Sequence, residues 1–149
     1  MRDRRKDWYE AIRVTSTLSP VDQMHLEALV GEWLPLPDVA ERLGTDVGKV
    51  RRMLAEGTLV AVRLGERGVR GVPVRFLQQT DDGWVVRPSL GGTITVLRDA
   101  GFSDDEAVGW LFTPDDSLAD LVGAPRTPVD ALLAGFKTEI RRRAQAMAF

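Results

Sequence analysis

The period of the hydrophobic residues changes near the middle of the chain. Between Leu36 and Leu54 apolar residues recur three or four positions apart, which is typical of helices with one buried face. From Leu59 onward the apolar residues follow the closer spacing of strands, and glycines interrupt the pattern. The elements predicted are helices over 37–43 and 46–56, strands over 59–62 and 72–77, and a turn over 65–68.

Residues at the ends of the two predicted helices support these boundaries. Pro37 suits a first helical turn, where its missing N–H costs nothing, and Asp38 favours the positive end of the helix dipole. Thr45 is expected to cap the start of the second helix with its hydroxyl. Gly44 and Gly57 can adopt the left-handed conformation that ends a helix.

Small and apolar residues occupy the positions that a helix-turn-helix requires. Ala40 supplies a small contact where the helices cross, and Gly44 supplies the turn four residues later. The residues expected to face inward are Val39, Leu43, Val47, Val50 and Leu54. An ordinary helical hairpin with a solvated basic face shows a similar pattern, so the spacing alone leaves both interpretations open.

The residues left outside on the second helix and along the hairpin are basic. Arginine can form bidentate hydrogen bonds with guanine in the major groove, and lysine can neutralise phosphate. An arginine-bearing hairpin directly after the second helix has the position of a wing, which contacts the DNA backbone or the minor groove. We therefore expect a winged helix-turn-helix between Leu36 and Phe76. Its expected DNA-binding residues are Thr45, Lys49, Arg51, Arg52, Arg63, Arg67, Arg70 and Arg75.

Helical patterns flank this region on both sides. Residues 7–14 and 21–33 have helical spacing, and Ser103 with Glu106 forms the signature of a capping box. After the hairpin we expect a strand over 84–86 and helices over 90–100, 103–112 and from 127 onward, the last as one continuous helix. The chain is thus expected to adopt an α+β fold: a helical or partly disordered N-terminal segment (1–33), a winged helix-turn-helix domain (34–88) and a small helical C-terminal domain (89–149).

The composition is that of an ordinary globular protein, but the charge is unevenly distributed. Of the 149 residues 44% are hydrophobic and 28% are charged, and the net charge is -2. Residues 49–75 carry seven basic and two acidic side chains, whereas residues 99–130 carry eight acidic side chains and one basic. This asymmetry is typical of a protein with one half that faces a polyanion, but two solvated surfaces would explain it equally well.

No feature of the sequence indicates an enzyme, a cofactor or a membrane protein. His25 is the single histidine and there is no cysteine, so no set of metal ligands is evident. Acidic runs at 104–106 and 115–116 lack a companion base or nucleophile, and the glycines fit neither a P-loop nor a dinucleotide motif. No apolar run approaches the roughly 18 to 20 residues that cross a bilayer, and no apolar core follows the basic N-terminus. We therefore expect a cytoplasmic protein that acts by binding.

Two further groups have ordinary structural interpretations. Trp33, Trp84 and Trp110 are expected to anchor the core rather than to stack on bases. The arginines at 141–143 would offset the negative end of the last helix, or would add phosphate contacts if this helix packs beside the wing.

Two stretches, LPDVAERLG at 36–44 and VGKVRRMLAEGTLVAVR at 47–63, are similar to winged helices of excisionase and MerR type. They more closely resemble a small actinobacterial DNA-binding family, and this resemblance continues through WLFTPD at 110–115 and RRAQAM at 142–147. It covers residues 36–149 and implies a winged helix, a helical C-terminal domain and DNA binding.

The same resemblance implies control by a Ser/Thr protein kinase, because a mycobacterial member of the family is the substrate of one. The family's modified threonine lies in the N-terminal tail. Thr15 and Thr17 are available in this chain, but the tail itself does not match the family.

A second resemblance concerns the C-terminal half. The segments WL at 110–111 and TPVDAL at 127–132 are similar to the toxin-binding domain of Xre/ParS-type antitoxins. This similarity implies a partner-binding surface that includes Trp110, Leu111, Leu132 and Phe136. The same residue types also serve plain helical packing, so both interpretations stay open.

We interpret the chain as a sequence-reading double-stranded DNA-binding protein that regulates transcription. Since one winged helix reads few base pairs, a homodimer or another partner is expected to add specificity through the acidic helical half. The alternative is a protein-interaction module (an adaptor, a kinase substrate or an antitoxin-like toxin binder) whose C-terminal helical domain is the partner surface.

Overall fold

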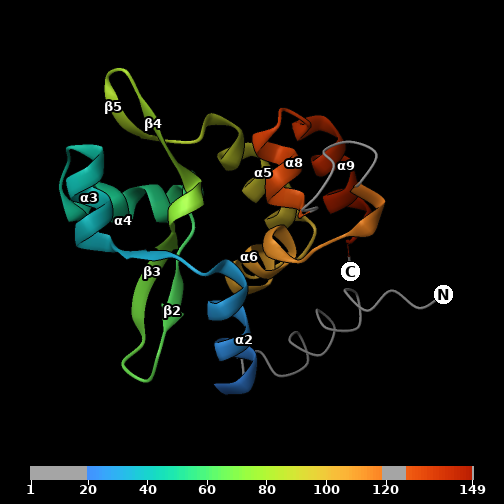
Figure 1. Cartoon of the computed structure of the whole chain (residues 1–149), viewed down its shortest axis with the longest axis horizontal. Coiled ribbons are helices and arrows are strands. Elements are labelled where there is room, and N and C mark those ends of the chain that lie inside the picture. Colours follow the sequence, from blue (N-terminus) through green and yellow to red (C-terminus); the bar gives the residue numbers. More distant parts are fainter. Residues whose placement is uncertain (1–19, 119–126, 149) are drawn as a thin grey trace.

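A small antiparallel sheet and the helices around it form the first part of the computed structural model, which describes residues 20–118 and 127–148 (Figure 1). The sheet has the strand order β1-β3-β2. The elements of this part are α2 (Pro20–Val30), β1 (Trp33–Pro35), α3 (Leu36–Leu43), α4 (Val47–Glu56), β2 (Val62–Leu64) and β3 (Val69–Pro73). Their order is that of a winged helix-turn-helix, as predicted, with β2 and β3 as the wing. The helix expected over 7–14 lies outside the described residues.

The helix predicted over 21–33 is shorter than expected. It ends at Val30, and Gly31 follows with a φ of +85°, a conformation that L side chains rarely adopt. Trp33 instead begins β1, where it pairs with Pro73 of β3. This strand was missed because three residues are too short to show a period.

Both strands of the wing are shifted from their predicted positions. The first, β2, begins later than predicted, and the second, β3, begins and ends earlier. The apolar residues Leu59, Val60 and Ala61 are buried before β2 begins, so their spacing reflects burial rather than strand pairing. The returning strand β3 ends at Pro73, and the N–H of Val74 just after it still donates to Glu32 O at 3.1 Å. A 3-10 turn over Val74–Phe76 then leads into a further strand.

The predicted cap of α4 is also wrong by one residue. Asp46, not Thr45, is the capping residue, since its side chain accepts a hydrogen bond of 2.7 Å from the backbone N–H of Lys49. The backbone N–H of Thr45 donates instead to Ala40 O across the turn, at 2.9 Å. The expected glycine ends are confirmed, with Gly44 and Gly57 both left-handed.

A second hairpin and a group of helices complete the fold. These are β4 (Leu77–Thr80), β5 (Gly83–Val86), α5 (Pro88–Asp99), α6 (Asp104–Phe112), a 3-10 turn over Asp116–Leu118, α8 (Pro128–Leu133) and α9 (Lys137–Ala146). The capping box of Ser103 and Glu106 is confirmed at the start of α6. None of the helices in the described ranges is long and apolar enough to cross a bilayer.

The last helix is broken, contrary to the prediction of one continuous helix. Gly135, with a φ of +101°, lies between α8 and α9 and turns the chain. This break lets α9 pack against both α5 and α8, so that apolar residues of both halves reach the core. A straight helix would present only one face to its neighbours.

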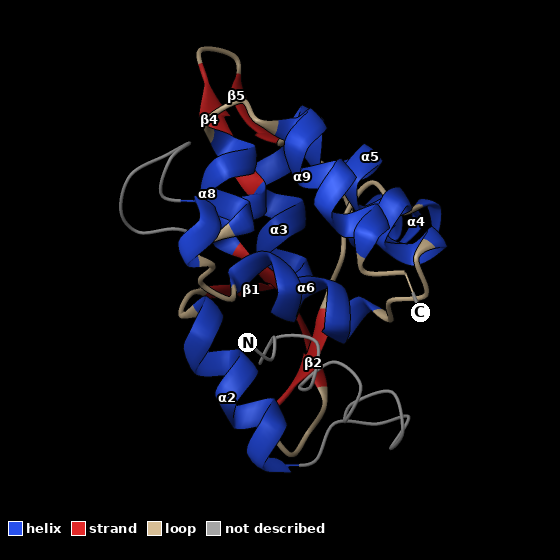
Figure 2. Ribbon diagram, turned by 90° about the vertical axis from the view of Figure 1, so that its right-hand side faces the viewer, coloured by secondary structure: helices blue, strands red, loops and turns tan. Residues whose placement is uncertain are grey.

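One hydrophobic core runs through the winged helix and the C-terminal helices. Phe76, at the end of the winged helix, packs on Phe112 of α6 with ring centroids 5.7 Å apart. Leu26 of α2 is fully buried, and α2 also contacts α6. Figure 2 shows α2 and α4 on opposite sides of β2. The two parts therefore hold each other in place through shared apolar contacts.

The break at Gly135 generates a test of stability. In Gly135→Ala the new Cβ would have no atom within 4 Å, but the backbone conformation is strained for alanine. We therefore expect the free energy of unfolding to fall by about 1–2 kcal/mol. Gly91→Ala is the matched control within α5, where the new Cβ meets Thr58 at an ordinary 3.6 Å; we expect it to stabilise by about 0.5–1 kcal/mol. Urea denaturation of both variants checks this, and shifts of the same sign would contradict it.

Candidate nucleic-acid interface

Packing between α3 and α4 decides which face of α4 meets solvent. Val39 of α3 and Val50 of α4 are fully buried, and Ala40 is nearly so. The other residues expected to face inward also do so: Leu54 is buried, and Leu43 and Val47 are half-buried and pack on the core. The predicted inner face is confirmed.

The opposite face of α4 is basic and open. Lys49, Arg51 and Arg52 are all exposed, whereas Thr45 is half-buried in the turn before the helix. Gly48 and Ala55 are also exposed on α4. Because both are small, they leave room beside the cations for a nucleic-acid backbone to approach the helix. Such a face has the charge and the shape of a recognition helix.

The wing presents more arginines on a tight turn. Gly65 and Gly68 both have positive φ, and the N–H of Gly68 donates to Gly65 O at 3.3 Å. Arg63 and Arg67 are exposed, and Arg70 is half-buried. Arg63 lies directly opposite Arg70 in the β2–β3 register. Like charges opposite each other repel, so an anion near this pair would be stabilised.

A contact from α2 reaches the turn of the wing. Glu27 Oε1 accepts a hydrogen bond of 2.7 Å from the backbone N–H of Gly65. The backbone oxygen of Glu27 accepts from Trp33 Nε1 at 3.2 Å. Sequence reasoning missed Glu27, because no local pattern links residues that lie 38 positions apart.

Arg75 is placed differently from the other expected DNA contacts. Its guanidinium forms an ion pair of 2.6 Å with Asp130 of α8, and its backbone oxygen accepts from Arg87 Nε at 2.6 Å. Burial would raise the pKa of Asp130, but hydrogen bonds from Thr127 and Arg75 outweigh it and lower that pKa. Arg75 therefore ties the winged helix to the C-terminal helices.

The C-terminal helices also contact the end of α4. A Cβ at Gly57 would come within 2.8 Å of Arg98 Nη1, so this α5 guanidinium lies against the C-terminal end of α4. A cation is stabilised there by the helix dipole. Asp104 holds Arg98 from the other side at 3.0 Å.

The tryptophans expected in the core differ in their exposure. Trp110 is buried, whereas Trp33 and Trp84 are half-buried. The guanidinium of Arg42 lies 4.7 Å from the centre of the Trp84 ring, a cation–π contact between α3 and β5. These two residues line a shallow hollow with Leu34, Asp38 and Glu41.

The residues expected to bind a partner lie mostly inside the protein. Trp110, Leu111 and Leu132 are buried, and Phe136 is half-buried between α8 and α9. A partner would reach the first three only if the C-terminal helices moved apart. Partner binding through them stays a prediction.

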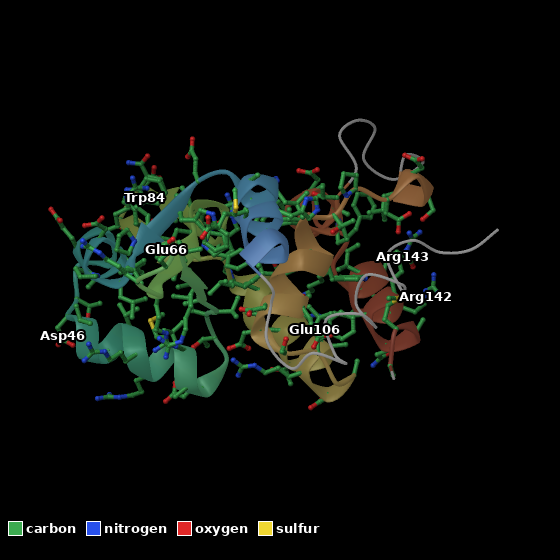
Figure 3. All side chains as sticks on the ribbon, turned by 90° about the horizontal axis from the view of Figure 1, so that it is seen from below. Asp46, Glu66, Trp84, Glu106, Arg142 and Arg143 are labelled. Carbon is green, nitrogen blue, oxygen red and sulfur yellow. The ribbon has the colours of Figure 1, made fainter. Side chains whose placement is uncertain are left out.

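The arginines at 141–143 take part in contacts among the C-terminal helices. Arg141 donates to Ser89 O at 3.2 Å, while Arg142 and Arg143 both pair with Glu139. Hydrogen bonds from these two guanidiniums lower the pKa of Glu139 to about 2. Figure 3 shows Asp46, at the start of α4, and Arg142 at opposite ends of the molecule.

Within residues 20–118 and 127–148, no group of three or more His, Cys, Asp or Glu residues is arranged to hold a metal ion. The acidic run at the start of α6 serves the helix itself. Glu106 Oε1 accepts from the backbone N–H of Ser103 at 2.9 Å, and burial raises the pKa of Asp105.

Comparisons with known proteins match both parts of the chain. Residues 20–77 match the family described as DNA-binding protein Rv2175c, wHTH domain, and residues 86–148 match the Rv2175c C-terminal domain of unknown function. The DNA-binding protein Rv2175c of Mycobacterium tuberculosis (strain ATCC 25618 / H37Rv) is 48% identical over 121 residues, which cover 76% of this chain and 79% of that protein.

A solved structure agrees with this match. The NMR structure of Rv2175c superposes with a TM-score of 0.65 at 45% sequence identity, covering 79% of this chain and 82% of that chain. Sequence and fold thus give the same result over both parts, and the resemblance expected from residues 36–149 is confirmed. The chain therefore belongs to the Rv2175c family of winged helix-turn-helix proteins.

Proposed function

We propose that this protein binds double-stranded DNA and regulates transcription, with α4 in the major groove and the wing on the phosphate backbone. The observation that carries the proposal is the open basic face of α4 beside an arginine-bearing wing. It is supported by the relative at 48% identity, which is named a DNA-binding protein.

The two elements suit different parts of the duplex. Lys49, Arg51 and Arg52 project from a helix whose inner face is fully used for packing, so they are free to reach base edges and phosphates. Arg63, Arg67 and Arg70 follow the wing, where they would neutralise phosphates and release counterions. Thr45, in the turn before α4, would contact the phosphate backbone.

The proposed action is binding without catalysis or a cofactor, in the cytoplasm where bacterial DNA lies. One winged helix covers few base pairs, so we further propose that a second copy or another partner adds specificity. A Ser/Thr protein kinase is a proposed partner from the family resemblance alone. Thr15 and Thr17, its candidate sites, lie outside the described residues.

A double substitution on α4 tests the DNA contact. We expect Arg51→Ala/Arg52→Ala to weaken binding to random duplex DNA at low salt by about tenfold to a hundredfold, because each arginine contact contributes about 1 kcal/mol or more. Fluorescence anisotropy over a series of salt concentrations measures the affinity, and the slope of log K against log salt should fall by about 2.

The matched control is Lys137→Ala/Arg142→Ala, which removes the same charge from exposed positions on α9. It should leave both the affinity and the salt slope nearly unchanged. Equal losses in the two double variants would show that only net charge matters, and no salt-sensitive binding by the wild type would refute the proposal.

Arg75 is expected to act on stability instead of on DNA. Arg75→Ala removes a partly exposed ion pair and should lower the free energy of unfolding by about 0.5–1 kcal/mol in urea denaturation. The salt slope of DNA binding should stay at the wild-type value, whereas Arg70→Ala on the wing should lower it by about 1. A lower salt slope for Arg75→Ala would contradict this expectation and would indicate that Arg75 contacts DNA.

A further inference from the structure

The turn of the wing is held from two sides. Glu27 of α2 accepts the N–H of Gly65, the first residue of the turn, at 2.7 Å. At the other end of the turn, Arg63 Nη1 donates to Gly68 O at 3.4 Å. Both peptide groups belong to glycines with positive φ, which have no side chain to fix them. Besides the bond within the turn from Gly68 N–H to Gly65 O, the turn is therefore held by Arg63 from the wing itself and by Glu27 from outside the wing.

The carboxylate of Glu27 is well suited to hold the turn because α2 is itself anchored. Leu26, the preceding residue, is fully buried in the core. Trp33 Nε1 donates to the backbone oxygen of Glu27 at 3.2 Å, which ties the last turn of α2 to the start of β1. In Figure 2, α2 lies on the side of β2 away from α4. Glu27 thus reaches the wing from the side opposite the recognition helix.

We propose that Glu27 is a positioning residue for DNA binding, which sets the wing at the distance where its arginines meet the phosphate backbone. The inference rests on the proposed function. Charge makes the assignment unusual, since a carboxylate beside a DNA-binding surface normally repels the polyanion and weakens binding. Here the hydrogen bond that Glu27 accepts from Gly65 N–H outweighs that repulsion.

Two substitutions of Glu27 separate these effects, because both remove the same negative charge. Glu27→Gln keeps an amide oxygen that can accept from Gly65 N–H, whereas Glu27→Ala has no acceptor. We expect Glu27→Gln to bind random duplex DNA at least as tightly as the wild type. Glu27→Ala should bind about threefold to tenfold more weakly, the range that corresponds to the loss of one exposed hydrogen bond.

The salt dependence distinguishes a displaced wing from a general loss of folding. In Glu27→Ala the slope of log K against log salt should fall by about 1, because one phosphate contact is lost. In an Arg67→Ala background the Glu27→Ala substitution should have a smaller effect, since both act through the wing. Thermal unfolding of the full chain controls for folding. Hydrogen exchange of the Gly65 amide should be faster in Glu27→Ala but not in Glu27→Gln.

Glu66→Ala is the matched control, since Glu66 is an exposed carboxylate on the same turn. Its removal should tighten DNA binding by relieving repulsion. If both Glu27 variants tightened binding as Glu66→Ala does, Glu27 would merely repel DNA and the proposal would be overturned. No duplex binding by the wild type would overturn the proposed function and this role together. Wild-type binding that neither Glu27 variant changes would overturn the role of Glu27 alone.

Discussion

The close packing of α3 against α4 is the constraint on which the rest of the structure depends. Val39 of α3 and Val50 of α4 are both fully buried, and Ala40 is small enough for the helices to approach. This contact fixes the rotation of α4 about its own axis. With its apolar stripe turned inward, the cations at 49, 51 and 52 are left on one open face. A larger residue at Ala40 would change the crossing of the helices and with it the direction of that face.

Support for α4 and the wing comes from other elements of the fold, α2 among them. Arg98 of α5 lies against the C-terminal end of α4, and Glu27 of α2 holds the turn of the wing. Phe76 and Phe112 join the two parts through the core, and the ion pair of Arg75 with Asp130 adds a polar link at the surface. The C-terminal helices therefore contact the proposed DNA-binding part of the chain at α4, at Phe76 and at Arg75. The charges are divided in the same way: residues 49–75, in the winged helix, are mainly basic, and residues 99–130, in the C-terminal part, are mainly acidic.

Local residues were enough to predict much of the fold. Glycines 44 and 57 end the two helices as expected, Ser103 forms its capping box, and the inner face of α4 follows from its spacing. The errors share a cause. Asp46 and Thr45 are both good capping residues, and only the path of the turn decides between them. The buried run at 59–61 looks like a strand because burial and pairing give similar patterns over so few residues.

By itself the sequence determined the two helices, their inner and outer faces and the basic wing, because each depends on residues within a few positions of one another. Only the tertiary structure decided that Arg75 pairs with Asp130, that Glu27 reaches Gly65 and that the last helix breaks at Gly135 to pack on α5. The two pairings join residues that lie 55 and 38 positions apart in the chain. The break at Gly135 lets α9 pack only where α5 provides a surface for it. No local period records which distant surfaces meet, because that choice is made by the packing of the whole core.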